Sequence, residues 1–400
     1  MKRTSTVFML SAVMVLFLFA SCKKTDINPA TSTAESSIEN KMSENGANPD
    51  EAIFKTLPNA TTNNHFYIES NKKSKNTILV FAQQQNGQLV LKDEVSSGGY
   101  GYGEALGSQS ALAVSKNYNL LFAVNAGSGS ISSFRINENT GALQLLFTAS
   151  SNGQLPVSLS VHENKLFVLN AISSSICGYS FTPDGFLTKI EGAEHNLSAV
   201  NADGAQIKFQ PDGAALYVTE KATNKIDKFI LDKNGAVTAS IIIQSQGVEP
   251  FGFDYARNNR FLVVSNAANG FSGAGSCTSY KFTNAGLSDV NGAVSNFETA
   301  PCWVATAKFG VFAFVSNTGT NNLSSYYIDA NGALTLIKAV AAADGKAPID
   351  IAVSDDNRFV YVIYSGSHTV AAYKRKPSGI IEFVDKVTTL PDFAAGLVTD

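Results

Sequence analysis

From about residue 64 to the end of the chain, short apolar runs alternate with clusters of Gly, Asn, Ser and Asp. Runs such as PVSLSV (156–161) and FLVVSN (261–266) have the length of strands and are bounded by residues that favour turns. No stretch of this part of the chain sustains the 3.6-residue period of an amphipathic helix. The pattern therefore predicts an all-β protein built from many short strands.

These strands recur as a repeating unit. Clear copies of one strand are LFAVN ending at Asn125, LFVLN at Asn170, LYVTE at Glu220, FLVVSN at Asn266 and FAFVSN at Asn317, with weaker copies FYIESN at Asn71 and FVYVIY at Tyr364. Successive copies end 45 to 54 residues apart, which is the length of a four-stranded propeller blade. We expect the repeated Asn side chains to shape tight turns by bonding to the backbone that follows them.

The two ends of the repeat complete one another. The first unit, from about His65 to Ser97, holds only the last three strands of a blade, and PDFAAGLV (391–398) resembles a first strand. Together they complete a seventh blade with the C-terminal strand innermost, so the ring closes without a free edge at its junction. We predict a seven-bladed β-propeller over residues 63–400, and a monomer.

Two segments carry a resemblance to a known family. FQPDGAALYVTE (209–220), APIDIAVSDDNRFVYVI (347–363) and the recurring VSN, SxxSxxI and NGAL elements are similar to the lactonase-type propellers, which include bacterial 6-phosphogluconolactonase and YVTN-repeat proteins. The resemblance covers roughly residues 64–398. It implies a lactone hydrolase, and it implies a functional glutamate at the strand end that Glu220 occupies.

The chain also departs from this family. Where the resemblance implies a Pro-Arg-His element, the matching residues are Gly204, Ala205 and Gln206, and Ile349 replaces an expected Arg after Pro348. Arg could hold the phosphate or carboxylate of a substrate, and His could serve as the base. Their loss favours a ligand- or partner-binding module, and a lactone hydrolase that uses Glu220 as the base is the alternative.

The site is expected where the loops leaving the second and fourth strands gather over the mouth of the central channel. Glu220 and His195 are the catalytic candidates, because opening a lactone needs a base to activate water. The ligand-binding candidates on this face are Tyr100, Tyr102, Glu104, Lys221, Glu249 and His368. Glu220 has a structural alternative as a hydrogen-bonded strand-end residue. Trp303 is expected to pack between blades or against the channel.

The N-terminus has the layout of a lipoprotein leader. Lys2 and Arg3 precede an apolar run to Ala20, and Cys22 follows Ser21 at the position that becomes lipidated in bacterial lipoproteins. We predict a signal peptide over 1–21 and a disordered tether over 22–62 that is rich in Ser, Thr and Asn. An ordinary cleaved signal peptide is the alternative. Lys23 and Lys24 follow the cysteine without an Asp, which favours the outer membrane.

Charge and cysteine content exclude several classes of function. Losing Lys2 and Arg3 moves the formal charge from −3 to −5, and no basic tract remains, so no nucleic acid is expected as a partner. The spacing of Cys177, Cys277 and Cys302 fits neither a metal site nor a dense disulfide framework. We expect separate buried thiols, and a Cys277–Cys302 disulfide is the alternative. No cofactor is expected. The expected partners are the membrane, through the lipid, and a glycan, lactone or envelope protein at the channel mouth. A purely structural envelope protein is a third possibility.

Overall fold

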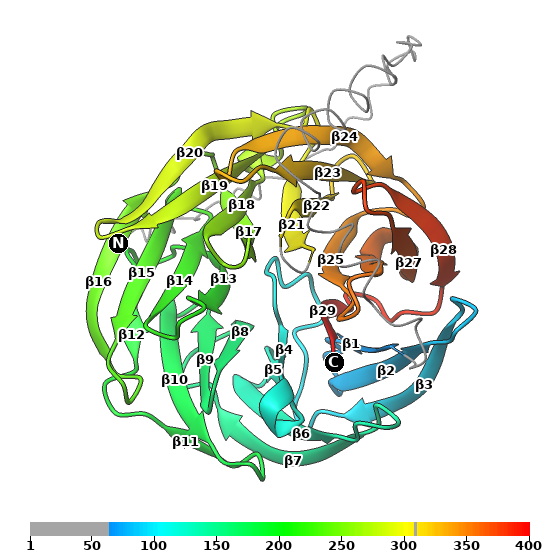
Figure 1. Ribbon diagram of the computed structural model, residues 1–400. Helices are drawn as coiled ribbons and strands as arrows, with labels where there is room; N and C mark the ends of the chain where they lie inside the picture. Colours follow the sequence, from blue (N-terminus) through cyan, green and yellow to red (C-terminus); the bar gives the residue numbers. More distant parts are fainter. Residues whose placement is uncertain (1–63, 308–309) are drawn as a thin grey trace, which may run out of the picture.

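A computed structural model of the chain describes residues 64–307 and 310–400. It consists of seven antiparallel sheets arranged as blades around a central axis, as Figure 1 shows. The predicted all-β, seven-bladed propeller is confirmed. The predicted signal peptide, Cys22 and the tether lie outside the described residues. Within the part that the structure describes, no helix is long and apolar enough to span a membrane.

Each blade runs from an innermost to an outermost strand. Blades one to three consist of β29 (Ala395–Thr399), β1 (Asn64–Glu69), β2 (Thr77–Gln83) and β3 (Leu89–Ser96); β4 (Leu112–Ser115), β5 (Leu120–Asn125), β6 (Ser130–Ile136) and β7 (Leu143–Ser150); and β8 (Pro156–His162), β9 (Lys165–Asn170), β10 (Ser175–Phe181), β11 (Leu187–Lys189) and β12 (His195–Asn196). Blades four and five consist of β13 (Gly204–Phe209), β14 (Ala215–Glu220), β15 (Lys225–Leu231) and β16 (Val237–Gln244); and β17 (Pro250–Ala256), β18 (Phe261–Asn266), β19 (Ser276–Thr283) and β20 (Gly286–Ser295). Blades six and seven consist of β21 (Pro301–Thr306), β22 (Phe312–Asn317), β23 (Asn322–Ile328) and β24 (Leu334–Ala342); and β25 (Pro348–Val353), β26 (Phe359–Tyr364), β27 (Thr369–Arg375) and β28 (Ile381–Val387). Three short 3₁₀ turns complete the structure: η1 (Lys116–Tyr118), η2 (Ala268–Gly270) and η3 (Ser365–Ser367).

The ring closes as the sequence predicts. The C-terminal strand β29 pairs antiparallel with β1 and forms the innermost strand of blade one, and the sheet order is β29-β1-β2-β3. The Asp400 backbone N–H donates to the His65 carbonyl at 3.4 Å, so the end of the chain lies beside the first described strand. The first blade is therefore built from both ends of the described chain.

The core lies between neighbouring blades, where apolar side chains from facing sheets pack together. Phe122 of blade two meets Phe181 of blade three with ring centroids 4.8 Å apart, and Phe66 of blade one stacks on Tyr361 of blade seven at 4.6 Å. These rings are almost fully excluded from solvent. Because every blade needs two neighbours to bury both of its faces, the ring folds as one unit.

The strand-end asparagines have a different role from the expected one. Asn125 donates from Nδ2 to the Ser132 hydroxyl at 2.8 Å, and Asn317 donates likewise to Ser324 at 2.8 Å. These amides therefore bridge the second and third strands of a blade instead of bonding to the backbone that follows. Each Asn is fully buried, so the bridge also satisfies polar atoms that water does not reach.

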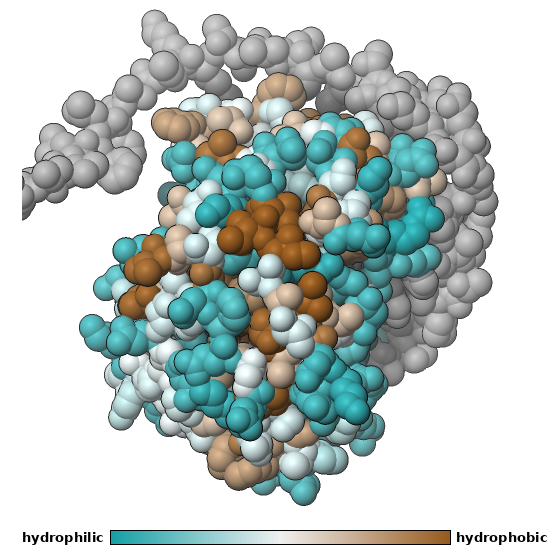
Figure 2. Space-filling model, turned by 90° about the vertical axis from the view of Figure 1, so that its left-hand side faces the viewer, coloured by the Kyte–Doolittle hydropathy of each residue, from teal (hydrophilic) through white to brown (hydrophobic). Residues whose placement is uncertain are grey.

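The outermost strand of each blade has the largest share of solvent-exposed residues. Figure 2 looks at the side of the ring where β16 lies in Figure 1, and it shows apolar patches between polar side chains. Ile242 on β16 and Phe186 beside β11 are each about half exposed.

Cys177, Cys277 and Cys302 are buried free thiols, which confirms the expectation of separate cysteines.

Candidate functional site

The segment that joins β3 to β4 crosses the central channel. Figure 1 shows this loop, in cyan, reaching over the middle of the ring. The Gln109 side chain donates from Nε2 to the Val304 carbonyl in blade six at 2.8 Å, and its backbone N–H donates to the Ala205 carbonyl in blade four at 3.0 Å. The indole N–H of Trp303 donates to the Ser108 carbonyl at 2.7 Å. Residues 105–110, which we call the channel loop, therefore close the channel from within.

A repeated hydrogen bond explains why Gln109 fits there. The Ser158 hydroxyl accepts the Ile207 N–H of the next blade at 3.1 Å, and Gln206 Oε1 accepts the Phe253 N–H at 2.6 Å. In blade five the equivalent position is Gly252, which has no side chain to offer. Gln109 Oε1 fills that place and accepts the Val304 N–H at 3.1 Å.

Beside the channel loop lies a cavity of about 360 Å³, which we call the mouth pocket. It lies where loops that follow second and fourth strands converge, as expected for the channel mouth. Blades six, seven and one and the channel loop contribute its walls, which are lined by Ala105, Leu106, Gly107, Ser108, Trp303, Thr318, Ile349, Asp350, Ser365, Gly366, His368, Asp392, Phe393, Ala394 and Ala395. Most of these side chains are apolar, which is usual for a small-molecule site.

Asp350 is the buried acid of this pocket. It lies on β25, is 2 % exposed, and accepts the Gly396 N–H at Oδ2 with a distance of 2.9 Å. Burial raises the pKa of Asp350 to about 7, although hydrogen bonds from the Gly396 and Ser110 backbone act in the opposite direction. Near neutral pH the carboxyl group is therefore present in both protonation states, and it can accept or donate a hydrogen bond.

The rim of the mouth pocket adds a second polar group. His368 lies at the end of η3 with its Nδ1 3.3 Å from Asp392 Oδ1, and both side chains are open to solvent. Phe393 beside them is 47 % exposed. The pocket thus combines aromatic and aliphatic side chains with two carboxyl groups, of which Asp350 is buried and Asp392 is exposed. Arg and Lys are absent from the residues that line it.

Glu220 lies at the end of β14 and is completely buried. Its Oε1 accepts the Ser198 N–H at 2.8 Å, and its Oε2 accepts the Ser198 hydroxyl at 2.6 Å and the hydroxyl of Thr223. The Ser198 N–H also lies 2.9 Å from Asp227 Oδ2. Burial raises the pKa of Asp227 to about 8. The hydrogen bond to Glu220 and the charge of Glu220 act in the same direction. Asp227 therefore keeps its proton to a higher pH than a free aspartic acid.

His195 lies in the short outermost strand β12, which pairs with β10. Its ring centroid is 5.2 Å from that of Phe229, and its Nδ1 lies 2.7 Å from the Asn196 carbonyl. Within the described residues, no hydrogen bond or ion pair joins His195 to Glu220. The two catalytic candidates are therefore held by separate contacts, and neither lines the mouth pocket.

The six ligand-binding candidates fall into three groups. Only His368 lines the mouth pocket. Lys221 donates to the Gly107 carbonyl at 2.6 Å and lies 3.1 Å from Asp203, while burial raises the pKa of nearby Glu249. The remaining three lie on the approach to the channel loop, where Tyr100 and Glu104 are exposed and Tyr102 is half-buried.

Sequence reasoning missed Asp350, Asp392 and Phe393. A signal for Asp350 exists, because it is an acid inside the otherwise apolar strand PIDIAV (348–353) and burying a charge is costly without a partner. Asp392 and Phe393 belong to the segment that was interpreted only as the closing strand. Trp303 was correctly placed, since it packs on Phe251 with centroids 4.8 Å apart and faces the channel loop.

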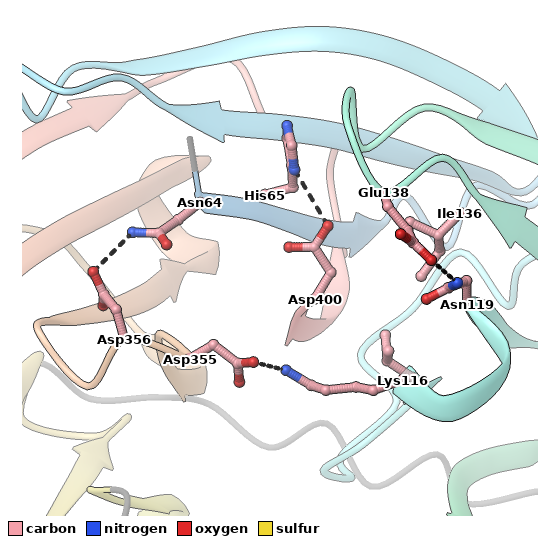
Figure 3. A pocket seen from close by; sticks show the side chains of 10 residues that line it. Asn64, His65, Lys116, Asn119, Ile136, Glu138, Asp355, Asp356 and Asp400 are labelled. Atoms are coloured by element: carbon pink, nitrogen blue, oxygen red, sulfur yellow. Dashed lines mark hydrogen bonds and ion pairs between the residues drawn. The ribbon is translucent and has the colours of Figure 1, made fainter. Parts of the chain in front are cut away.

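A second cavity, of about 420 Å³, opens among the turns that join first to second strands, on the other face of the ring. Figure 3 shows that its polar side chains point toward one another. His65 Nδ1 lies 3.3 Å from Asp400 Oδ2, Lys116 pairs with Asp355, and Asn119 donates to Glu138. These contacts join blades one, two and seven beside the C-terminal strand, so we assign them to ring closure.

No group of three or more His, Cys, Asp or Glu side chains in residues 64–307 and 310–400 is arranged to hold a metal ion. The mouth pocket offers carboxyl, hydroxyl and imidazole groups beside apolar side chains.

Comparison with known proteins identifies the family. The family model described as "Lactonase, 7-bladed beta-propeller" matches residues 101–188, 166–270 and 279–393. No curated protein matches the chain.

Solved structures agree on the fold. A Bacteroides fragilis protein provisionally assigned as a 6-phosphogluconolactonase has a TM-score of 0.67 and 15 % identity, with 86 % of this chain and 99 % of that chain covered. A similarly assigned Bacteroides uniformis protein has a TM-score of 0.70 and 16 % identity, with coverage of 85 % and 100 %. The Pseudomonas aeruginosa periplasmic gluconolactonase PpgL has a TM-score of 0.64 and 18 % identity, with coverage of 84 % and 99 %. At these identities the likeness concerns the fold alone.

Proposed function

The chain belongs to the family of lactonase-type seven-bladed β-propellers, and from this premise we propose that it is an envelope-anchored lipoprotein whose propeller binds a ligand at its channel mouth. The observation that carries the binding function is the mouth pocket. Its volume of about 360 Å³ falls within the range of roughly 300–1,000 Å³ typical of small-molecule sites. Its apolar wall and few polar groups fit the same class of site.

The anchor rests on the leader sequence. Lys2, Arg3, the apolar run and Cys22 together support export and lipidation, and the absence of Asp after Cys22 favours the outer membrane. Cell fractionation of the Cys22→Ala variant tests this part. The wild-type protein should sediment with outer membranes while the variant becomes soluble, and equal partitioning of the two would contradict the anchor.

Ligand binding is tested by thermal unfolding against a panel of saccharides, amino acids, nucleosides and short peptides. A ligand at about a hundredfold its dissociation constant stabilises the folded state by roughly 2.7 kcal/mol, so Tm should rise. Ala105 is exposed and lines the pocket, so Ala105→Trp should fill it and abolish the rise. Ala343→Trp, at an exposed position in another mouth-face loop, is the matched control and should keep it.

Two results would contradict the binding function at this pocket. One is a Tm shift of the same size in Ala105→Trp as in the wild-type protein. The other is a panel in which no compound changes the Tm of any of the three proteins.

The alternative function is lactone hydrolysis with Glu220 as the base and His195 as its helper, and family membership favours it. Hydrolysis would require the Glu220 side chain to break its hydrogen bonds to Ser198 and Thr223, because these bonds hold it in a position that solvent does not reach. We rank it second for this reason. It predicts that Glu220→Gln abolishes turnover, whereas a binding propeller keeps its ligand when Glu220 is changed.

A further inference from the structure

The charge of the mouth pocket restricts what it can hold. Asp350 and Asp392 line it together with His368, and neither Arg nor Lys does. The ammonium group of Lys221 lies close to the channel loop but already binds the Gly107 carbonyl and Asp203. A phosphate ester carries a charge of about −1.5 to −2 at neutral pH. Within this pocket such a group would meet two carboxyl groups and no free cation.

The polar groups of the pocket are arranged as hydrogen-bond acceptors. Asp350 presents its carboxyl group on the wall formed by β25, and Asp392 presents another at the rim. Ser365 and Thr318 add hydroxyl groups on the same side of the channel. Hydroxyl groups of a ligand can donate to these oxygens, and a neutral ligand avoids opposing the negative charge of Asp392.

The pocket also has apolar lining residues. Trp303 and Leu106 are buried there, Ile349 is partly buried, and Phe393 is exposed. The Trp303 indole is fixed in place by its bond to Ser108 and by packing on Phe251. A pyranose ring has an apolar face of C–H groups and an edge of hydroxyl groups, so it matches a pocket that combines aromatic and aliphatic side chains with hydrogen-bond acceptors.

We propose that the mouth pocket binds an uncharged sugar ring and excludes its phosphorylated form, with Ile349 as the residue that sets this selectivity. The proposal rests on the proposed ligand-binding function and narrows it to one chemical class. Ile349 lies next to Asp350 at the start of β25 and is only partly buried, so its side chain borders the space where a substituent of the ring would lie.

Trp303 provides the readout, because it is the only tryptophan of the chain and it lines the pocket. Its fluorescence is titrated with D-glucose, D-mannose and D-galactose, each paired with its own 6-phosphate. We expect at least one neutral sugar to change the emission saturably, with its 6-phosphate binding at least tenfold more weakly.

Ile349→Arg tests the selectivity directly. It places a cation at the pocket wall, so the 6-phosphate should gain at least tenfold in affinity while the neutral sugar gains nothing. Ile172→Arg is the matched control, since Ile172 is an exposed residue of another mouth-face loop and does not line the pocket. It should leave both affinities as they are in the wild-type protein.

The outcomes separate this proposal from the function on which it rests. Tighter binding of a 6-phosphate than of its neutral partner by the wild-type protein would overturn the selectivity and leave a binding site in place. An equal change in the affinity for the 6-phosphate in Ile172→Arg and Ile349→Arg would likewise overturn the role of Ile349 and leave the binding site in place. If no sugar changes Trp303 emission, the sugar class is overturned, and only a flat thermal-shift panel would remove the binding function as well.

Discussion

At the scale of single residues, Glu220 and Asp227 replace a pair that other blades build from uncharged groups. Asn125 bonds to Ser132, Asn266 to Thr278 and Asn317 to Ser324, each between the second and third strands. The pairing register places Glu220 and Asp227 at the same positions of blade four. Glu220 therefore holds a structural position of the blade, whatever else it does, and Ser198 supplies the donors that an amide would otherwise bring.

This pair makes stability depend on pH. Burial and the neighbouring Glu220 raise the pKa of Asp227 from its ordinary 3.8 to about 8. The folded protein then holds a proton that the unfolded chain releases between about pH 4 and pH 8, so the free energy of unfolding falls as pH rises through this range. As pH rises from 5 to 8.5, the Tm of Asp227→Asn should fall much less than the Tm of the wild-type protein.

Asp350 titrates in the same direction, with its pKa raised to about 7, so some pH dependence should remain in the Asp227→Asn variant. Asp184→Asn is the control, because the Asp184 side chain is 98 % exposed. A wild-type-like loss of Tm in Asp227→Asn would show that Asp227 does not hold this proton in the folded protein. The sequence held a clue to this pair, since Glu220 and Asp227 have the same seven-residue spacing as Asn125 and Ser132 and as Asn317 and Ser324.

At the scale of elements, the channel loop depends on the absence of a side chain in blade five. A Cβ atom on Gly252 would lie 2.0 Å from Gln109 Oε1, so Gly252→Ala should expel the Gln109 amide. The Val304 N–H and carbonyl would then lose their partners. We expect the free energy of unfolding to fall by about 1–3 kcal/mol, measured by urea denaturation.

A double variant provides the control for this prediction. In the Gln109→Ala background, Gly252→Ala should cost less stability than it does in the wild-type protein, because only the 2.8 Å approach of the new Cβ atom to the Cys302 carbonyl then remains. If Gly252→Ala unfolds at the wild-type urea concentration, Gln109 does not secure the channel loop.

The strands were predictable because each one repeats a local pattern of apolar and turn residues, as FLVVSN and FAFVSN do. The channel loop was recognised only as a long Gly-rich insertion. Its role depends on Gln109 meeting Val304, 195 positions later, and no periodicity encodes that contact. Most residues that line the mouth pocket were missed for the same reason, since blades six, seven and one meet the loop only in the closed ring.

At the scale of the whole molecule, stability should depend on the C-terminal strand. β29 supplies the inner strand of blade one, and Gly396 donates to Asp350 of blade seven. Deleting residues 391–400 exposes the edge of β1 and separates blades one and seven, so we expect the protein to lose cooperative unfolding and to aggregate. Circular dichroism during heating and size-exclusion chromatography measure both effects.

Position in the chain should not matter for this strand. A permuted protein in which residues 391–400 and a short turn precede residue 64 would restore the order of strands that the other blades have. It should unfold cooperatively near the wild-type Tm. A deletion variant that remains monomeric and cooperative would show that the ring does not need this closure.

Lactone hydrolysis is the measurement that tests the central claim most directly, because it separates a binding propeller from an enzyme of the same family. Purified residues 23–400 are assayed against 6-phosphogluconolactone and neutral sugar lactones, with Glu220→Gln in parallel. We predict no turnover above the spontaneous rate for either protein. Turnover clearly above that rate, lost in Glu220→Gln, would contradict the account and identify a lactonase whose buried glutamate becomes exposed during catalysis.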